Sequence, residues 1–69
     1  MDHPYETVKV PREGDIAEHL YADLDPREVA AVVVDESGNV DMIFLKAPGG
    51  GAHMGPFEAT NYVYTRRAV

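Results

Sequence analysis

The residues best suited to chemistry lie in a glycine-rich segment at 47–56, which reads APGGGAHMGP. Backbone N–H groups of neighbouring glycines can cradle a phosphate or a carboxylate, and a histidine adds a further donor. Gly50, His53, Arg66 and Arg67 are therefore the candidate ligand-binding residues for an anion or another small ligand. Phosphate loops lead into a helix and are usually followed by Lys and Ser or Thr, which this segment lacks. The competing interpretation is a flexible connection.

Acidic and histidine side chains at helical spacing are one pattern expected of a metal site. Asp15, His19 and Asp23 are four residues apart and would share one face of a helix. His3 and Asp2 would complete such a site only if the N-terminus folded back. Ordinary solvent-facing residues follow the same spacing, and the chain has no cysteine to supply thiolate ligands or disulfides. We predict neither a metal nor another cofactor.

Catalysis requires a nucleophile, or an acid–base pair, placed in a cleft. The only serine, Ser37, falls in a predicted turn, and Glu18 and His19 are sequence neighbours that would point apart on a helix. A chain of 69 residues also leaves little room for an enclosed pocket. We therefore expect no enzymatic activity.

The C-terminal segment at 61–67 combines aromatic and basic side chains. Tyr62, Tyr64 and Arg66 would lie on one face of a strand, which suits stacking on bases and pairing with phosphates. Nucleic-acid binding through this strand is thus one alternative function. The other interpretation is an amphipathic edge strand whose tyrosines cover apolar surface.

The charge of the chain argues against nucleic acid as the main partner. Residues 1–45 hold 11 acids and 3 bases, a balance of −8, whereas residues 46–69 hold 1 acid and 3 bases, a balance of +2. An acidic body repels nucleic acid and anionic membranes, steers toward basic protein surfaces and also keeps a small protein soluble. A nucleic-acid mimic is a sharper version of this hypothesis. The candidate acidic surface consists of Glu13, Asp15, Glu18, Asp23, Asp25 and Glu28.

The elements that must position these residues begin with a helix expected over 15–24. Asp15 is a favourable N-cap, and Glu18 three residues later completes an acidic variant of the capping box. Ile16, Leu20 and Leu24 would form its apolar stripe, and Asp25-Pro26 would end it.

Strands rich in Val, Tyr and Thr are expected at 5–10, 29–35, 40–46 and 61–67. The middle two form a hairpin around the turn at 36–39, where Gly38 would take a positive φ. We therefore predict one α+β domain over residues 1–69, with strand–helix–strand–strand–strand order and a flexible Gly/Pro-rich loop at 47–56. Its antiparallel sheet would have three to four strands and one amphipathic helix.

The hairpin is apolar on both faces, which predicts a second copy of the chain as partner. A single helix covers one face of a sheet, and the other face then needs the loop, the tail or another molecule. The expected homodimer interface is Val40, Met42, Phe44, Tyr62 and Tyr64. The alternative is a monomer in which Met54, Phe57 and the loop cover the second face.

These features favour a small acidic protein-interaction module, acting as an adaptor, a regulator or an inhibitor. The longest apolar run, Val29–Val34, is too short to span a membrane, and no secretory signal is evident, so a cytoplasmic location is expected. Anion binding by the glycine-rich loop and nucleic-acid binding by the tail strand are the alternatives.

Overall fold

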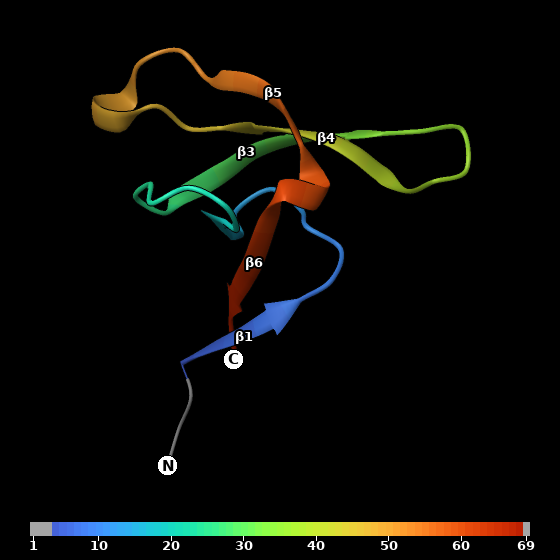
Figure 1. Cartoon of the computed structure of the whole chain (residues 1–69), viewed down its shortest axis with the longest axis horizontal. Coiled ribbons are helices and arrows are strands. Elements are labelled where there is room, and N and C mark those ends of the chain that lie inside the picture. Colours follow the sequence, from blue (N-terminus) through green and yellow to red (C-terminus); the bar gives the residue numbers. More distant parts are fainter. Residues whose placement is uncertain (1–3, 69) are drawn as a thin grey trace.

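The computed structural model describes residues 4–68, which form one sheet of six antiparallel strands in the spatial order β1-β6-β2-β3-β4-β5 (Figure 1). The strands are β1 (Tyr5–Val8), β2 (Ile16–His19), β3 (Arg27–Val34), β4 (Val40–Leu45), β5 (Met54–Glu58) and β6 (Tyr62–Arg67). Two 3-10 turns, η1 (Pro48–Gly50) and η2 (Ala59–Asn61), are the only helical elements of the described residues. The predicted α+β class is therefore wrong, and the fold is all-β.

The segment at 15–24, expected to be the amphipathic helix, is instead the short strand β2 followed by an exposed loop. β2 lies between β6 and β3 and pairs with both, so its backbone groups are satisfied across the sheet. Ala17 is buried and pairs with Tyr64 of β6, whereas Leu20 and Leu24 of the expected stripe are exposed. Pairing with distant strands has overridden a local pattern that also fits a helix.

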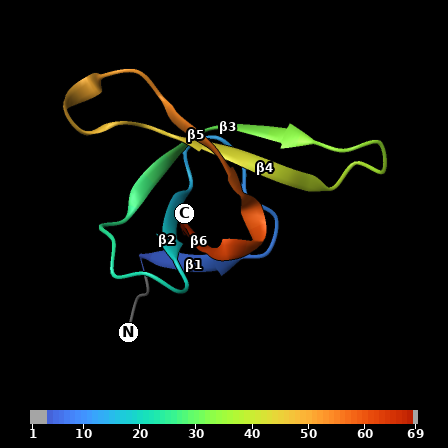
Figure 2. The ribbon, with the colours of Figure 1, turned by 45° about the horizontal axis from the view of Figure 1, so that its top comes forward.

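The sheet bends at β3, which belongs to both of its halves. The first residues of β3, Arg27 and Glu28, pair with β2, and the rest of the strand pairs with β4. A register shift between Val29 and Ala31 marks the bend. One half-sheet consists of β1, β6 and β2, the other of β3, β4 and β5, and η2 carries the chain from β5 to β6 (Figure 2).

β3 and β4 form the predicted hairpin, and its far end projects from the body (Figure 1). We call residues 33–41 the arm. Asp35 closes its turn, because the Oδ1 atom accepts the N–H groups of Ser37 and Asn39. Gly38 has a φ of +87°, which confirms the positive φ expected there.

β5 begins inside the Gly/Pro-rich segment and pairs with β4 at the edge of the sheet. It contains Gly55 and Pro56, residues that usually interrupt strands. For this reason the sequence pattern does not predict β5. An edge strand tolerates proline because its outer side needs no backbone donor. Gly55 has a φ of +132°, and a Cβ added to it would lie 2.9 Å from the Ile43 oxygen.

The core lies between the two half-sheets and contains few large side chains. Its buried members are Ala17, Val29, Ile43, Leu45, Ala59 and Tyr64. Met54 and Phe57 of β5 pack against this cluster, so the chain itself covers the inner face of the hairpin. On the outer face, Met42 and Phe44 are partly buried and the neighbouring Val33 is 41% exposed.

Gly55→Ala should lower the free energy of unfolding by about 1–3 kcal/mol, because alanine at this φ is strained and its methyl group would meet the β4 backbone. Gly51→Ala is the matched control in the same segment. Its φ is −71°, and the added Cβ would lie 3.7 Å from the Ala47 Cβ, an ordinary contact. Urea denaturation followed by circular dichroism measures both, and equal effects would refute the placement of β5.

Candidate binding groove

A partly buried ion pair joins the start of β2 to the end of β6. Asp15 is 2% exposed, and its carboxylate accepts two bonds from the Arg66 guanidinium, Nε to Oδ1 at 2.7 Å and Nη2 to Oδ2 at 2.8 Å. The Arg12 N–H donates to Oδ2 as well. The Arg66 hydrogen bond holds the pKa of Asp15 below its usual value, although burial acts in the opposite direction. The pair fixes β6 against the chain that enters β2.

The predicted ligand-binding residues do not form one site, partly because Arg66 belongs to this ion pair. Arg66 is engaged by Asp15 and also donates to the Val10 carbonyl, so its Nε and Nη2 atoms are bonded within the chain. Gly50 and His53 are exposed in the 47–56 segment, which lies far from the C-terminus and the end of β6 (Figure 1). The structure does not bring the four candidate residues together.

The six acidic candidates also separate. Asp15 is buried with Arg66, and Glu28 forms an exposed pair with Lys46 at 2.6 Å. The other four, Glu13, Glu18, Asp23 and Asp25, are exposed. Without a helix they do not follow one helical face. Within residues 4–68 no group of three His, Asp or Glu side chains is placed to hold a metal ion, and the considered ligands Asp2 and His3 lie outside this range.

A groove of about 380 Å³ lies between the β2–β3 loop (residues 20–26) and β5. We call it the aromatic groove. Its apolar surface comes mainly from Leu45, Met54, Phe57 and Tyr62. Sequence patterns do not reveal it, because its parts come from a segment expected to be a helix, a segment expected to be a loop, and two strands.

The rings of the groove pack around Tyr62. His19 meets Tyr62 edge-on with a centroid distance of 4.9 Å, and Phe57 lies 6.2 Å from the same ring. Tyr64 lies 6.4 Å from Tyr62 on its other side and donates its hydroxyl hydrogen to the Ala59 carbonyl, which ties η2 to β6. Burial raises the pKa of Tyr62 and raises that of Tyr64 to about 12, so both rings are neutral phenols at physiological pH.

His19 is held by the backbone of the β2–β3 loop. Its Nδ1 atom accepts the N–H groups of Tyr21 and Ala22, both at 3.0 Å. A ring nitrogen that accepts cannot carry the proton, so the neutral ring carries it on Nε2. These bonds end β2, orient the imidazole against Tyr62 and leave Nε2–H as a donor.

The rim of the groove combines charge with exposed apolar surface. Asp23, Asp25 and Arg27 line it, and none of the three forms a salt bridge within the described residues. Next to them, Leu24 is 57% exposed and Tyr21 is 78% exposed. Burying such side chains against a partner is favourable, and their clustering at a groove is typical of a contact surface.

A second hollow, of about 420 Å³, shares Tyr62 with the aromatic groove, and its lining includes Val8, Val10, Val40 and Val63. We call it the valine hollow. Of the five predicted interface residues, Val40, Tyr62 and Tyr64 line it, although Tyr64 is buried beneath its floor. Met42 and Phe44 do not line it.

The polar side chains that line the aromatic groove are His19, Asp23, Asp25, Arg27 and Tyr62. Nδ1 of His19 is engaged by the backbone. Helices long and apolar enough to cross a membrane are not found among the described residues. Comparison with protein-family models, curated proteins and solved structures finds no match to this chain.

Arg66→Ala should clearly lower the free energy of unfolding, since it leaves the buried Asp15 carboxylate without its cation. Arg67→Ala, the exposed neighbour on the same strand, should change it by no more than about 0.5 kcal/mol. Arg66→Lys keeps the charge but not the bidentate contact, so its effect on the free energy of unfolding should lie between those of the other two variants. Urea denaturation measures all three, and an Arg66→Ala effect as small as the control would disprove the role of the pair.

The same pair predicts a pH dependence. The pKa of Asp15 in the folded chain lies below 3.8, its usual value, so its ionised form stabilises the fold above that pH and this contribution is lost as pH falls through the folded-state pKa. Asp15→Asn should therefore cost most near neutral pH and progressively less below about pH 3.8. Thermal unfolding of both proteins from neutral to acidic pH tests this. A difference between them that does not change with pH would contradict it.

Proposed function

We propose that this chain is a protein-interaction module whose aromatic groove binds a segment of a partner protein. The segment would carry an apolar or aromatic side chain next to an arginine or a lysine. The observation that carries the proposal is an aromatic groove beside two exposed carboxylates, Asp23 and Asp25, that lack a cationic partner among the described residues.

The apolar half of the contact would lie against Phe57, Met54 and Tyr62. One side of each of these side chains packs against the core, and another side lines the groove. An entering leucine or phenylalanine would also cover the exposed Leu24. Complete burial of one such side chain contributes about 1.5–3 kcal/mol, enough to make it the anchor of the contact.

The basic half of the contact would be held by the rim. Asp23 and Asp25 supply carboxylates, and the Tyr62 ring offers a face for a cation. The net charge of −6 adds a longer-range attraction for basic partners. Arg27 on the same rim would disfavour a second cation beside the first and so set the orientation of the segment.

The alternative functions gain no support from the same geometry. Arg66 is engaged by Asp15, which removes a cation from both the anion-binding and the nucleic-acid hypotheses. Tyr64 is 4% exposed and cannot stack on a base. The nucleic-acid mimic relied on carboxylates along a helix, and that helix is absent from the described residues.

Short capped peptides that place Arg next to Phe or Leu should bind the isotopically labelled chain and shift backbone amide signals at 17–27 and 54–62. Analogues with Glu in place of Arg, or Ser in place of the apolar residue, should bind much more weakly. Leu24→Ser should weaken binding about tenfold, equivalent to about 1.4 kcal/mol. Because Leu24 is exposed, this change leaves the fold intact.

Asp23→Asn combined with Asp25→Asn should also weaken binding and flatten its dependence on salt. Asp41→Asn, an exposed carboxylate on the arm, is the matched control and should have no effect. Nuclear magnetic resonance titration measures each affinity. Equal binding of the Arg and Glu peptides, or signal changes away from the groove, would overturn the proposal.

A further inference from the structure

The valine hollow leaves apolar side chains uncovered, and of its lining residues Tyr62 alone also lines the aromatic groove. Val40 lines it from the arm, and Val10 and Val63 line it from the body. Val10 is 65% exposed and Val63 36%. Val34 pairs with Val40 across the hairpin and is 52% exposed. Such a concentration of exposed aliphatic residues is characteristic of a contact surface.

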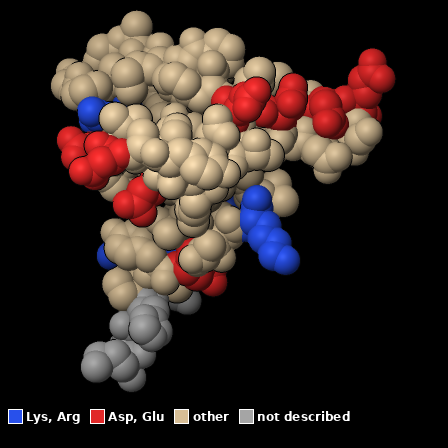
Figure 3. All heavy atoms as spheres, in the orientation of Figure 1, with Lys and Arg blue, Asp and Glu red and all other residues tan. Residues whose placement is uncertain are grey.

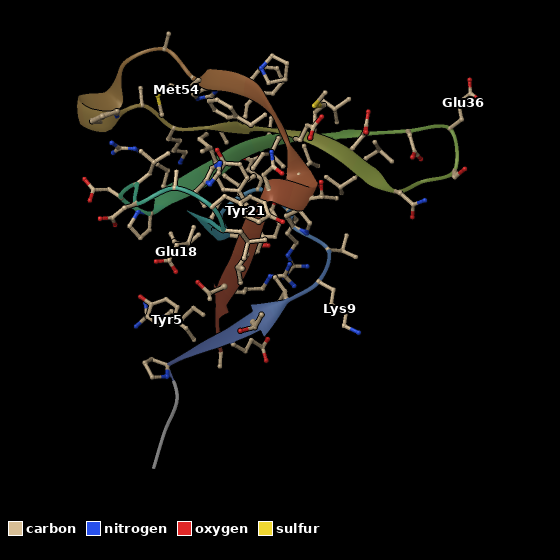
Figure 4. The ribbon with its side chains drawn as sticks, viewed as in Figure 1. Tyr5, Lys9, Glu18, Tyr21, Glu36 and Met54 are labelled. Carbon is tan, nitrogen blue, oxygen red and sulfur yellow. The ribbon has the colours of Figure 1, made fainter. Side chains whose placement is uncertain are left out.

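A basic residue lines this hollow, and acidic residues lie on the arm that contributes to its lining. Lys9 lines it from the chain that follows β1, and Asp35 and Glu36 lie at the tip of the arm. In Figure 4 Glu36 is at the end of the arm and Lys9 projects from the body below it. Figure 3 shows acidic side chains along the arm, which extends beyond the body. Lys9 forms no salt bridge within the described residues.

We propose that the valine hollow is the interface of a symmetric homodimer, in which the arm of each copy lies across the hollow of the other. Val34 and Val40 of one copy would cover Val10 and Val63 of the second. Glu36 of each copy would approach Lys9 of the other. A two-fold axis makes every such contact occur twice, which suits a surface that holds both an apolar projection and its complementary hollow.

The choice of a second copy rests on charge and on the edges of the sheet. Two chains of charge −6 repel each other unless their contact brings opposite charges together, and the hollow offers Lys9 to an acidic arm. Pairing of β5 edges is hindered by Pro56, which lacks a backbone donor. The outer face of the hairpin is less suitable, because Met42 and Phe44 are already partly buried. In addition, the charged residue Glu58 of β5 pairs with Met42.

Sedimentation equilibrium of the full chain across micromolar concentrations tests this dimer. The wild type should show a reversible monomer–dimer equilibrium. Val10→Asp should leave only monomer, and Lys9→Glu or Glu36→Lys alone should each weaken the dimer about tenfold. The double change Lys9→Glu with Glu36→Lys should restore most of the affinity. Arg67→Glu, the same charge change at an exposed base outside the hollow, should not affect it.

Lys9, Val10, Glu36 and Arg67 are exposed and Phe44 is partly buried, so circular dichroism of each variant checks that it is folded. A monomeric wild type at the highest concentration overturns the proposal. So does a dimer that survives Val10→Asp but is lost with Phe44→Asp, because that result would place the interface on the outer face. Binding of peptides to the aromatic groove is measured separately, and either result leaves the other proposal standing or falling on its own.

Discussion

The fold depends on one buried carboxylate. Asp15 is 2% exposed, and an ionised group at that depth is tolerated only when its charge and its oxygen lone pairs are satisfied. Arg66 and the backbone of Arg12 do this together, and they come from opposite ends of the chain. A slip of β6 by one residue would turn Arg66 to the other face of the sheet and leave the Asp15 carboxylate without its cation. We infer that the pair helps to select the register of β6, because the shifted register would leave a buried carboxylate without its cation.

The register of β6 also determines where its tyrosines lie in the aromatic groove, the valine hollow and the core. Tyr62, Tyr64 and Arg66 alternate along the strand and lie on its inner face, where they pair with residues of β2 and β1. Tyr64 fills the middle of the core and anchors η2, so the chain between β5 and β6 is fixed. Tyr62 then lies where the aromatic groove and the valine hollow meet, and it lines both. β6 therefore supplies the arginine of the ion pair, the core residue Tyr64, and Tyr62, which lines both the groove and the hollow.

The sequence predicts the parts of this structure that depend on neighbours in the chain. The hairpin and the C-terminal strand follow from β-branched residues and a glycine turn, and they were correctly predicted. The helix at 15–24 was wrong because Asp15 has the chemistry of an N-cap, whereas its partner is Arg66, 51 residues away. Asp15 and Arg66 were both selected as functional residues, for an acidic surface and an anion site. Only the fold shows that they neutralise each other. The aromatic groove was missed for the same reason, since its walls meet only after β2 and β5 have paired.

The net charge of the chain also changes meaning once its positions are known. The acidic residues are concentrated in the first 45 positions, and two of them, Asp15 and Glu28, are paired with cations from the C-terminal part of the chain. Two groups of the remaining carboxylates stand beside exposed apolar side chains: Asp23 and Asp25 beside Leu24, and Asp35 and Glu36 beside Val34. A surface built this way resists indiscriminate association, because its charges repel other acidic surfaces and remain hydrated. It becomes adhesive only to a surface that brings apolar groups and cations at matching positions. In the proposed contacts, selectivity would thus arise from pairing each exposed apolar cluster with its own carboxylates.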